Sequence, residues 1–161
     1  MFRLNRLTDY AVVVMSQMAL RGETRSAQQI SDDTGVPLPT VAKLLNLLGH
    51  AKLVASQRGA AGGYTLSAEP EEISVAQIIQ ALEGPIALTA CVDGATDTCD
   101  AESFCPMRGN WNKVNGAIRE ALTAVSLADM MTLPPAFGVP PGVSRGNAAK
   151  DDGTPRGVAK Q

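Results

Sequence analysis

The sequence predicts a mainly α fold with one small β-hairpin, arranged as a winged helix-turn-helix followed by a long helix. Apolar residues recur at helical spacing through the first fifty residues, and Gly and Pro divide this pattern into three short helices. Two short alternating segments then flank a glycine-rich break, which predicts a hairpin. A last apolar stripe follows residue 110 and predicts a one-sided helix.

The first helix is expected over residues 7–20. Thr8 or Asp9 could accept hydrogen bonds from the free backbone N–H groups at its start, and Gly22 follows its last apolar residue. No apolar run in the chain reaches the length needed to span a bilayer, and no signal-peptide cleavage site follows the first helix. We therefore expect a cytoplasmic protein without membrane contact.

The next two helices form the predicted helix-turn-helix. Ser26 is a suitable N-cap for a short helix, Gly35 supplies the turn, and Pro37 and Pro39 lead into a second helix over residues 40–50. The apolar side of that second helix is formed by Val41, Leu44, Leu45 and Leu48. Many helical hairpins share this pattern, so it becomes specific only with the segment that follows.

That segment, "LVASQRGAAGGYTLS", alternates into a strand, breaks at its glycines and returns as a strand at Tyr64. A helix-turn-helix followed directly by a hairpin is a winged helix. Arg58 and Gly59 lie at the wing tip, where permissive backbone would let a guanidinium enter a narrow minor groove. Thr40 and Lys43 would then contact phosphates or bases; otherwise they belong to a solvated surface.

The net charge of −2 does not indicate a nucleic-acid ligand, but the distribution of charge along the chain indicates one. Residues 1–65 contain seven Lys/Arg and four Asp/Glu, whereas residues 66–132 contain three and ten. A basic patch at the front of the chain can therefore attract phosphates although the whole chain is acidic.

Beyond the wing, Ser74 is expected to cap another short helix. A separate apolar stripe lies after the cysteines and consists of Trp111, Val114, Ile118, Leu122 and Val125. This stripe predicts a helix of about twenty residues, with a further short turn from Ser126. It could pack within one chain, but we favour a dimer helix, because winged-helix regulators read two half-sites about a two-fold axis. The expected domains are a winged helix (1–84), a cysteine loop (85–109), a dimerisation helix (110–132) and a disordered tail (133–161).

All three cysteines, Cys91, Cys99 and Cys105, lie in one acidic loop with the spacing C-x7-C-x5-C. Structural zinc sites usually show C-x2-C pairs and four ligands, and no nearby base completes a catalytic set, so we expect no enzyme. The loose spacing suits an iron–sulfur cluster, with zinc or reduced buried thiols as the alternatives. Pro106 is expected to open the long helix, which would place Cys105 at a helix N-terminus and favour its thiolate.

The segments "RLTDYAVVVMSQMA", "RGAAGGYTL" and "SVAQIIQALEG", followed by the three-cysteine loop, resemble the Rrf-type regulators that include IscR and NsrR. The resemblance extends to about residue 132, and "CPMRGNWNKVNGAIREALTAVSLADM" is most similar to the branch that regulates the SUF iron–sulfur assembly operon. It implies a homodimeric repressor that binds double-stranded operator DNA and carries a [2Fe–2S] or [4Fe–4S] cluster on its cysteines. It also implies that Arg58 enters the minor groove and that Pro39, Thr40 and Lys43 contact bases and phosphates.

The chain departs from this family pattern at two positions. Arg108 replaces the histidine that is the fourth ligand in IscR-like proteins, and a guanidinium cannot ligate. In NsrR-like relatives an aspartate of the partner's first helix is the ligand, and Asp9 occupies that position here, unless it merely caps the helix. Ala42 replaces a glutamate that tunes DNA choice, so the operator cannot be inferred. The resemblance implies a cluster-sensing regulator, with a nitric-oxide or redox sensor and a zinc or thiol structural protein as alternatives.

Overall fold

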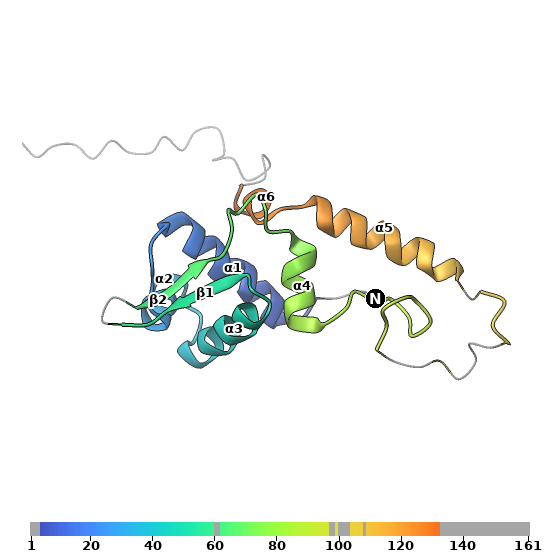
Figure 1. Cartoon of the computed structure of the whole chain (residues 1–161), viewed down its shortest axis with the longest axis horizontal. Coiled ribbons are helices and arrows are strands. Elements are labelled where there is room, and N and C mark those ends of the chain that lie inside the picture. The colour runs from blue at the N-terminus through green and yellow to red at the C-terminus, as the bar shows by residue number, and fades with distance from the viewer. Residues whose placement is uncertain (1–3, 60–61, 97–98, 100–103, 108, 133–161) are drawn as a thin grey trace, which may run out of the picture.

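The computed structural model describes residues 4–59, 62–96, 99, 104–107 and 109–132, so the tail predicted to be disordered lies outside the described residues. The described chain is mainly helical with one two-stranded antiparallel hairpin, which confirms the predicted fold class (Figure 1). Its elements, in chain order, are α1 (Arg6–Arg21), α2 (Ala27–Thr34), α3 (Leu38–His50), β1 (Val54–Gln57), β2 (Gly63–Leu66), α4 (Val75–Glu83), α5 (Asn110–Ala124) and α6 (Leu127–Met131).

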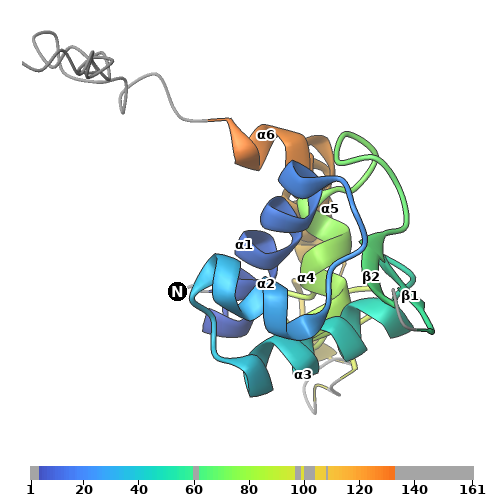
Figure 2. The same ribbon diagram turned by 90° about the vertical axis from the view of Figure 1, so that its left-hand side faces the viewer.

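The first four helices, the hairpin and α6 share one hydrophobic core, which we call the head. Figure 2 shows α1, α2 and α3 packed around a common centre, with the hairpin beside α3. Each helix contributes side chains that are fully or almost fully buried, because its apolar residues fall on one face. The largest of these side chains are Met15, Ile30, Leu44, Leu45, Leu48, Ile73, Ile78 and Leu127.

The helix starts follow the capping rules, with one correction. Asn5 caps α1, since its side chain accepts from the Leu7 N–H at 2.8 Å, so the expected cap at Thr8 or Asp9 is wrong. The helix begins one residue earlier than predicted, and Thr8 is buried within its first turn. Ser26 caps α2 as predicted, in a reciprocal capping box with Gln29.

The hairpin is short and its register is regular. Val54 pairs with Leu66 and Gln57 pairs with Gly63. The Val54 side chain is buried against the head, whereas the remaining residues of β1 are exposed. The wing therefore follows α3 with β1 packed only at its first residue, while Tyr64 and Leu66 of β2 are partly buried against the head.

The end of the described chain forms two helices within 110–132, where the sequence predicts a dimerisation helix of about twenty residues with a further short turn from Ser126. In the structure α5 ends at Ala124, Val125 is extended, and α6 turns back onto the head (Figure 1). Two backbone hydrogen bonds fix this return, from the Val75 N–H to the Val125 carbonyl (2.9 Å) and from the Leu127 N–H to the Ile73 carbonyl (2.7 Å). The reversal buries Leu127 completely, which a continuous helix would not do.

The start of α5 also differs from the prediction. The helix begins at Asn110, with Gly109 as its N-cap, so Pro106 does not open it and Cys105 does not lie in its first turn. In the described segments, every helix is too short or too polar to cross a membrane.

Candidate nucleic-acid interface and metal centre

The second helix of the helix-turn-helix, α3, divides cleanly into a buried and an exposed side. Four of its apolar residues are buried in the core, whereas Pro39 and Lys43 are exposed and Thr40 is half-buried. Thr40 is held in the first turn, where its N–H donates to the Pro37 carbonyl at 2.8 Å. These three predicted contact residues therefore lie together at the exposed start of α3, the part of a recognition helix that reaches base edges.

The wing, which follows α3 in the chain, carries a second exposed cation. Arg58 is exposed, and the next residue, Gly59, has a φ of 120°, a backbone conformation that favours glycine. A Cβ atom at Gly62 would lie 2.6 Å from the Gln57 carbonyl oxygen and 2.8 Å from that of Gly59, so the turn needs glycine there too. The glycines thus shape the tight turn that presents the guanidinium.

The three cysteines are partly exposed and form no disulfide. The Cys91 Sγ lies 3.3 Å from the Thr89 hydroxyl oxygen. Among the residues that the structure describes, no three His, Cys, Asp or Glu side chains gather closely enough to hold a metal ion, and Arg108 lies outside those residues. Three thiols in one partly exposed loop nevertheless form a donor set whose chemistry suits iron and sulfide.

Two asparagines of α5, which the sequence analysis missed, hold the first part of the cysteine loop. Buried Asn115 accepts from the Leu88 N–H and donates to the Ile86 carbonyl, both at 3.0 Å. Asn112 accepts from the Asp93 N–H at 3.0 Å and donates to the Asp93 carboxylate at 2.9 Å. The only signal in the sequence is their spacing of three, which places both amides on one face of a helix.

The apolar stripe of α5 is shared between two environments. Ile118 and Leu122 pack against α4 of the same chain, in a small cluster with Val75, Ala76, Ile79 and Ile86. Trp111 and Val114 are 42% and 44% exposed, and Val125 follows the helix as its C-cap. Among the described residues, the stripe is therefore left without a cover at the N-terminal half of α5 and at Val125.

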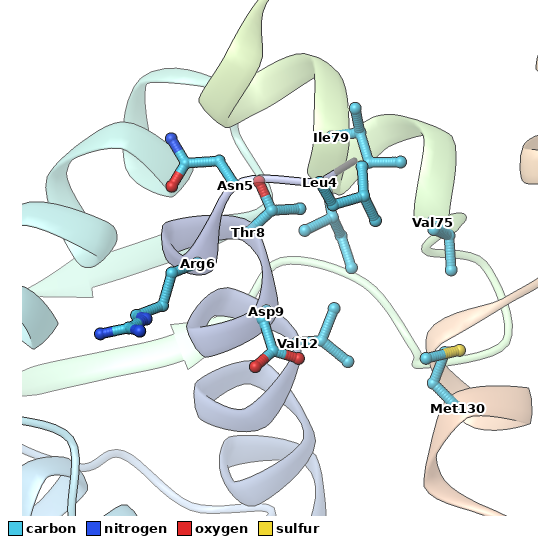
Figure 3. A pocket seen from close by; sticks show the side chains of 10 residues that line it. Leu4, Asn5, Arg6, Thr8, Asp9, Val12, Val75, Ile79 and Met130 are labelled. Atoms are coloured by element: carbon cyan, nitrogen blue, oxygen red, sulfur yellow. The ribbon is translucent and has the colours of Figure 1, made fainter. Parts of the chain in front are cut away.

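Asp9 lies on the exposed side of α1, at a cavity of about 650 Å³ formed by α1, α4 and α6. Figure 3 shows its carboxylate beside Val12, with Val75 and Ile79 of α4 and Met130 of α6 across the cavity. An exposed carboxylate next to an apolar hollow is available to another chain, and its role as a helix cap is excluded by Asn5.

Comparisons with known proteins agree with this architecture. Residues 4–133 match the family model described as "Rrf2: Iron-dependent Transcriptional regulator". The HTH-type transcriptional regulator IscR of Aliivibrio salmonicida is 32% identical over 76% of this chain and 73% of its own length. The regulator NsrR of Shouchella clausii is 25% identical over 80% of this chain and 88% of its own length.

Two solved structures are similar in both fold and sequence. IscR of T. potens has a TM-score of 0.58 and 31% identity, covering 81% of this chain and 86% of its own. CymR, the global cysteine regulator of B. subtilis, has a TM-score of 0.61 and 28% identity, covering 81% and 97%. With the winged helix, the three-cysteine loop and a family match over most of its length, the chain belongs to the Rrf2 family of winged-helix transcriptional regulators, in its IscR/NsrR-like group.

Proposed function

We propose that this protein is a cluster-responsive repressor of SUF-type iron–sulfur assembly genes and that it binds operator DNA as a homodimer. The single observation that carries the proposal is the placement of all three cysteines in the segment between α4 and α5. Cys91, Cys99 and Cys105 would hold a [2Fe–2S] or [4Fe–4S] cluster, with Asp9 of the partner subunit as the fourth ligand. Bound there, the cluster supplies a group that oxidants, nitric oxide and iron depletion can destroy.

The chemistry of the donors supports this ligand set. Thiolates are the ordinary ligands of iron–sulfur clusters, and the partial exposure of all three cysteines leaves them open to cluster delivery and loss. The Asp9 carboxylate is exposed at the cavity beside α4, where a second chain can approach it.

The DNA-binding part of the proposal relies on the exposed side of α3 and the wing. Pro39, Thr40 and Lys43 would contact bases and phosphates in the major groove, and Arg58 with Gly59 would reach the adjacent minor groove. A homodimer formed through the stripe of Trp111, Val114, Ile118, Leu122 and Val125, in which Ile118 and Leu122 also pack on α4 of their own chain, would present two such heads to half-sites one helical turn apart.

The contacts of α5 support a route from the cysteine loop to the heads. Asn112 and Asn115 bind the loop on either side of Cys91, and Ile118 and Leu122 pack on α4. A rearrangement of the loop therefore acts on α5 through the asparagines, and α5 sets the position of the head relative to its twin. Such a shift changes the match to paired half-sites.

The first experiment is the absorption spectrum of anaerobically purified protein, with iron and sulfide analysis. We expect a coloured protein that loses its colour in each Cys→Ala variant and part of it in Asp9→Ala, whereas Asp32→Asn, a change of one exposed carboxylate elsewhere, leaves it intact. A colourless protein with stoichiometric zinc would overturn the cluster.

The second experiment is footprinting of the holo and apo forms on the promoter of the protein's own operon. The proposal expects different affinities, and equal affinity would overturn the switch. Exposure of the holo form to oxygen, nitric oxide or a chelator then identifies the signal. A response to nitric oxide alone would replace assembly-gene control with nitric-oxide sensing by the same cluster.

A further inference from the structure

A half-buried ion pair, Arg25 with Asp33, lies where α1, the helix-turn-helix and the wing meet. We infer that this pair is a positioning device for DNA reading: it holds the base of the wing in a fixed place relative to the helix-turn-helix. The inference rests on the proposed use of the wing in DNA binding, and neither residue is placed in contact with DNA.

The backbone of Arg25 forms a third, one-residue strand against the wing. Its N–H donates to the Tyr64 carbonyl at 3.1 Å, and its carbonyl accepts from the Tyr64 N–H at 2.8 Å. The approach is so close that a Cβ atom at Gly63 would lie 2.6 Å from the Arg25 carbonyl oxygen. A two-stranded hairpin of this length is only marginally stable alone, so this bridge is an important support for the wing.

The side chain of Arg25 fixes the same residue to the helix-turn-helix. Its Nη2 lies 2.6 Å from an Asp33 carboxylate oxygen, and its Nη1 lies 3.1 Å from Glu23. The Arg25 and Asp33 side chains are only 17% and 18% exposed, so water screens this pair less than it screens most surface pairs. The hydrogen bond from Arg25 lowers the pKa of the Asp33 carboxyl below its ordinary value.

Asp33 lies in the last turn of α2, where a carboxylate opposes the helix dipole, so its position does not favour the helix itself. Arg21, at the end of α1, also reaches it at 3.4 Å. The neighbouring Asp32 is exposed and accepts from the Gln28 amide within the same helix. The two adjacent aspartates thus differ in their partners. Asp33 connects α2 to the end of α1 and to the residue that pairs with the wing, whereas Asp32 bonds within its own helix.

The mechanical consequence follows from the connectivity. Arg25 immediately precedes Ser26, the cap of α2, and pairs with Tyr64, which follows the wing tip that carries Arg58. Without the ion pair, Arg25 retains its backbone bonds to the wing but loses its tie to the C-terminal end of α2. The wing can then shift relative to α3, and Arg58 loses its fixed register with the recognition helix.

The experiment compares Asp33→Asn with Asp32→Asn in the full-length dimer. Both variants remove one negative charge from the same helix, so their non-specific attraction to DNA changes equally. We expect Asp33→Asn to bind a duplex of the protein's own promoter about fivefold more weakly than Asp32→Asn, the scale of a partly exposed ion pair. The difference should vanish in an Arg58→Ala background, because the wing then lacks the guanidinium whose position the ion pair fixes.

A penalty that persists undiminished in the Arg58→Ala background would overturn the inference, because the pair would then act through general stability. Equal binding by the two variants would also overturn it. If the wild-type protein does not bind the duplex, the proposed function fails by itself, and hydrogen exchange decides the inference. Faster exchange of the Tyr64 amide in Asp33→Asn than in Asp32→Asn would support it, and equal exchange would overturn it.

Discussion

The head and the segment formed by the cysteine loop and α5 differ in how they are stabilised. Large side chains from five helices meet in the head with no exposed surface, so its fold is determined within one chain. In α5 the only fully buried side chain is that of Asn115, while Trp111 stays 42% exposed. The head therefore carries its own stability, and the position of α5 depends on a few polar contacts, on the packing of Ile118 and Leu122 against α4 and on whatever covers its exposed apolar residues.

The largest effect on stability is expected from a substitution in the core of the head. Leu44→Ala removes a fully buried side chain and should lower the free energy of unfolding by about 2–5 kcal/mol, measured by urea denaturation. Leu20→Ala, at a position 70% exposed, is the control and should change it by about 0.5 kcal/mol or less. Similar losses for both would show that the head lacks the tight packing described above.

The next effect concerns the exposed side of α5. Trp111→Ala should weaken the proposed homodimer by about 2 kcal/mol, as expected for an aromatic anchor at an interface, while leaving the head folded. Analytical ultracentrifugation measures the dimer constant, with Lys113→Ala as the matched exposed change on the same helix. An unchanged dimer constant would assign Trp111 to some other role.

A smaller, local effect is expected at the contact between the two regions. Asn115→Ala leaves the Leu88 N–H and the Ile86 carbonyl without their partner and should cost about 1–2 kcal/mol. Hydrogen exchange should show the Leu88 amide opening faster while amides in α3 keep their protection. Uniform acceleration across both regions would contradict the separation between them.

The smallest effect depends on pH. Hydrogen bonds from the Ser126 backbone and side chain lower the pKa of Asp129 in the folded protein. A lowered pKa means that the ionised form adds stability above the ordinary aspartate value, and that this contribution disappears as the pH falls through the folded value. Asp129→Asn should therefore be less stable than wild type at neutral pH, with a gap that closes in acid. If the stability difference between the two proteins did not change with pH, the Asp129 carboxylate would be excluded as its cause.

The same division explains what the sequence could predict. The head follows local rules: Ser26 and Ser74 cap the helices expected of them, and the α3 stripe is buried as its spacing predicts. Ser126, where a short turn is predicted, is the cap of α6. Two errors concern local helix starts, namely the cap of α1 and the first residue of α5, and a third concerns a long-range contact. Val125 fits a helical stripe by spacing, but its carbonyl pairs with Val75, some fifty residues earlier in the chain, and the helix ends before it.

The candidate site shows the same pattern. The elements that carry the motif residues of the wing and α3 could be predicted from the sequence because their neighbours are close in the chain. The asparagines that hold the cysteine loop could not, since the partners of Asn115 lie 27 and 29 residues away. Arg25 was equally invisible, because its role depends on a bridge to Tyr64 that no local pattern encodes.

The bridge between Ser74 and Ser126 has a consequence for how this chain can change. The polypeptide leaves the head after α4 and returns to it at Ser126, beside the start of the same helix. The cysteine loop and α5 therefore form one long loop whose two ends lie close together. The entropy of closing such a loop grows only slowly with its length. Residues can thus be inserted into or deleted from the cysteine loop while the head keeps its architecture. A single head can in this way be combined with loops of different length and chemistry.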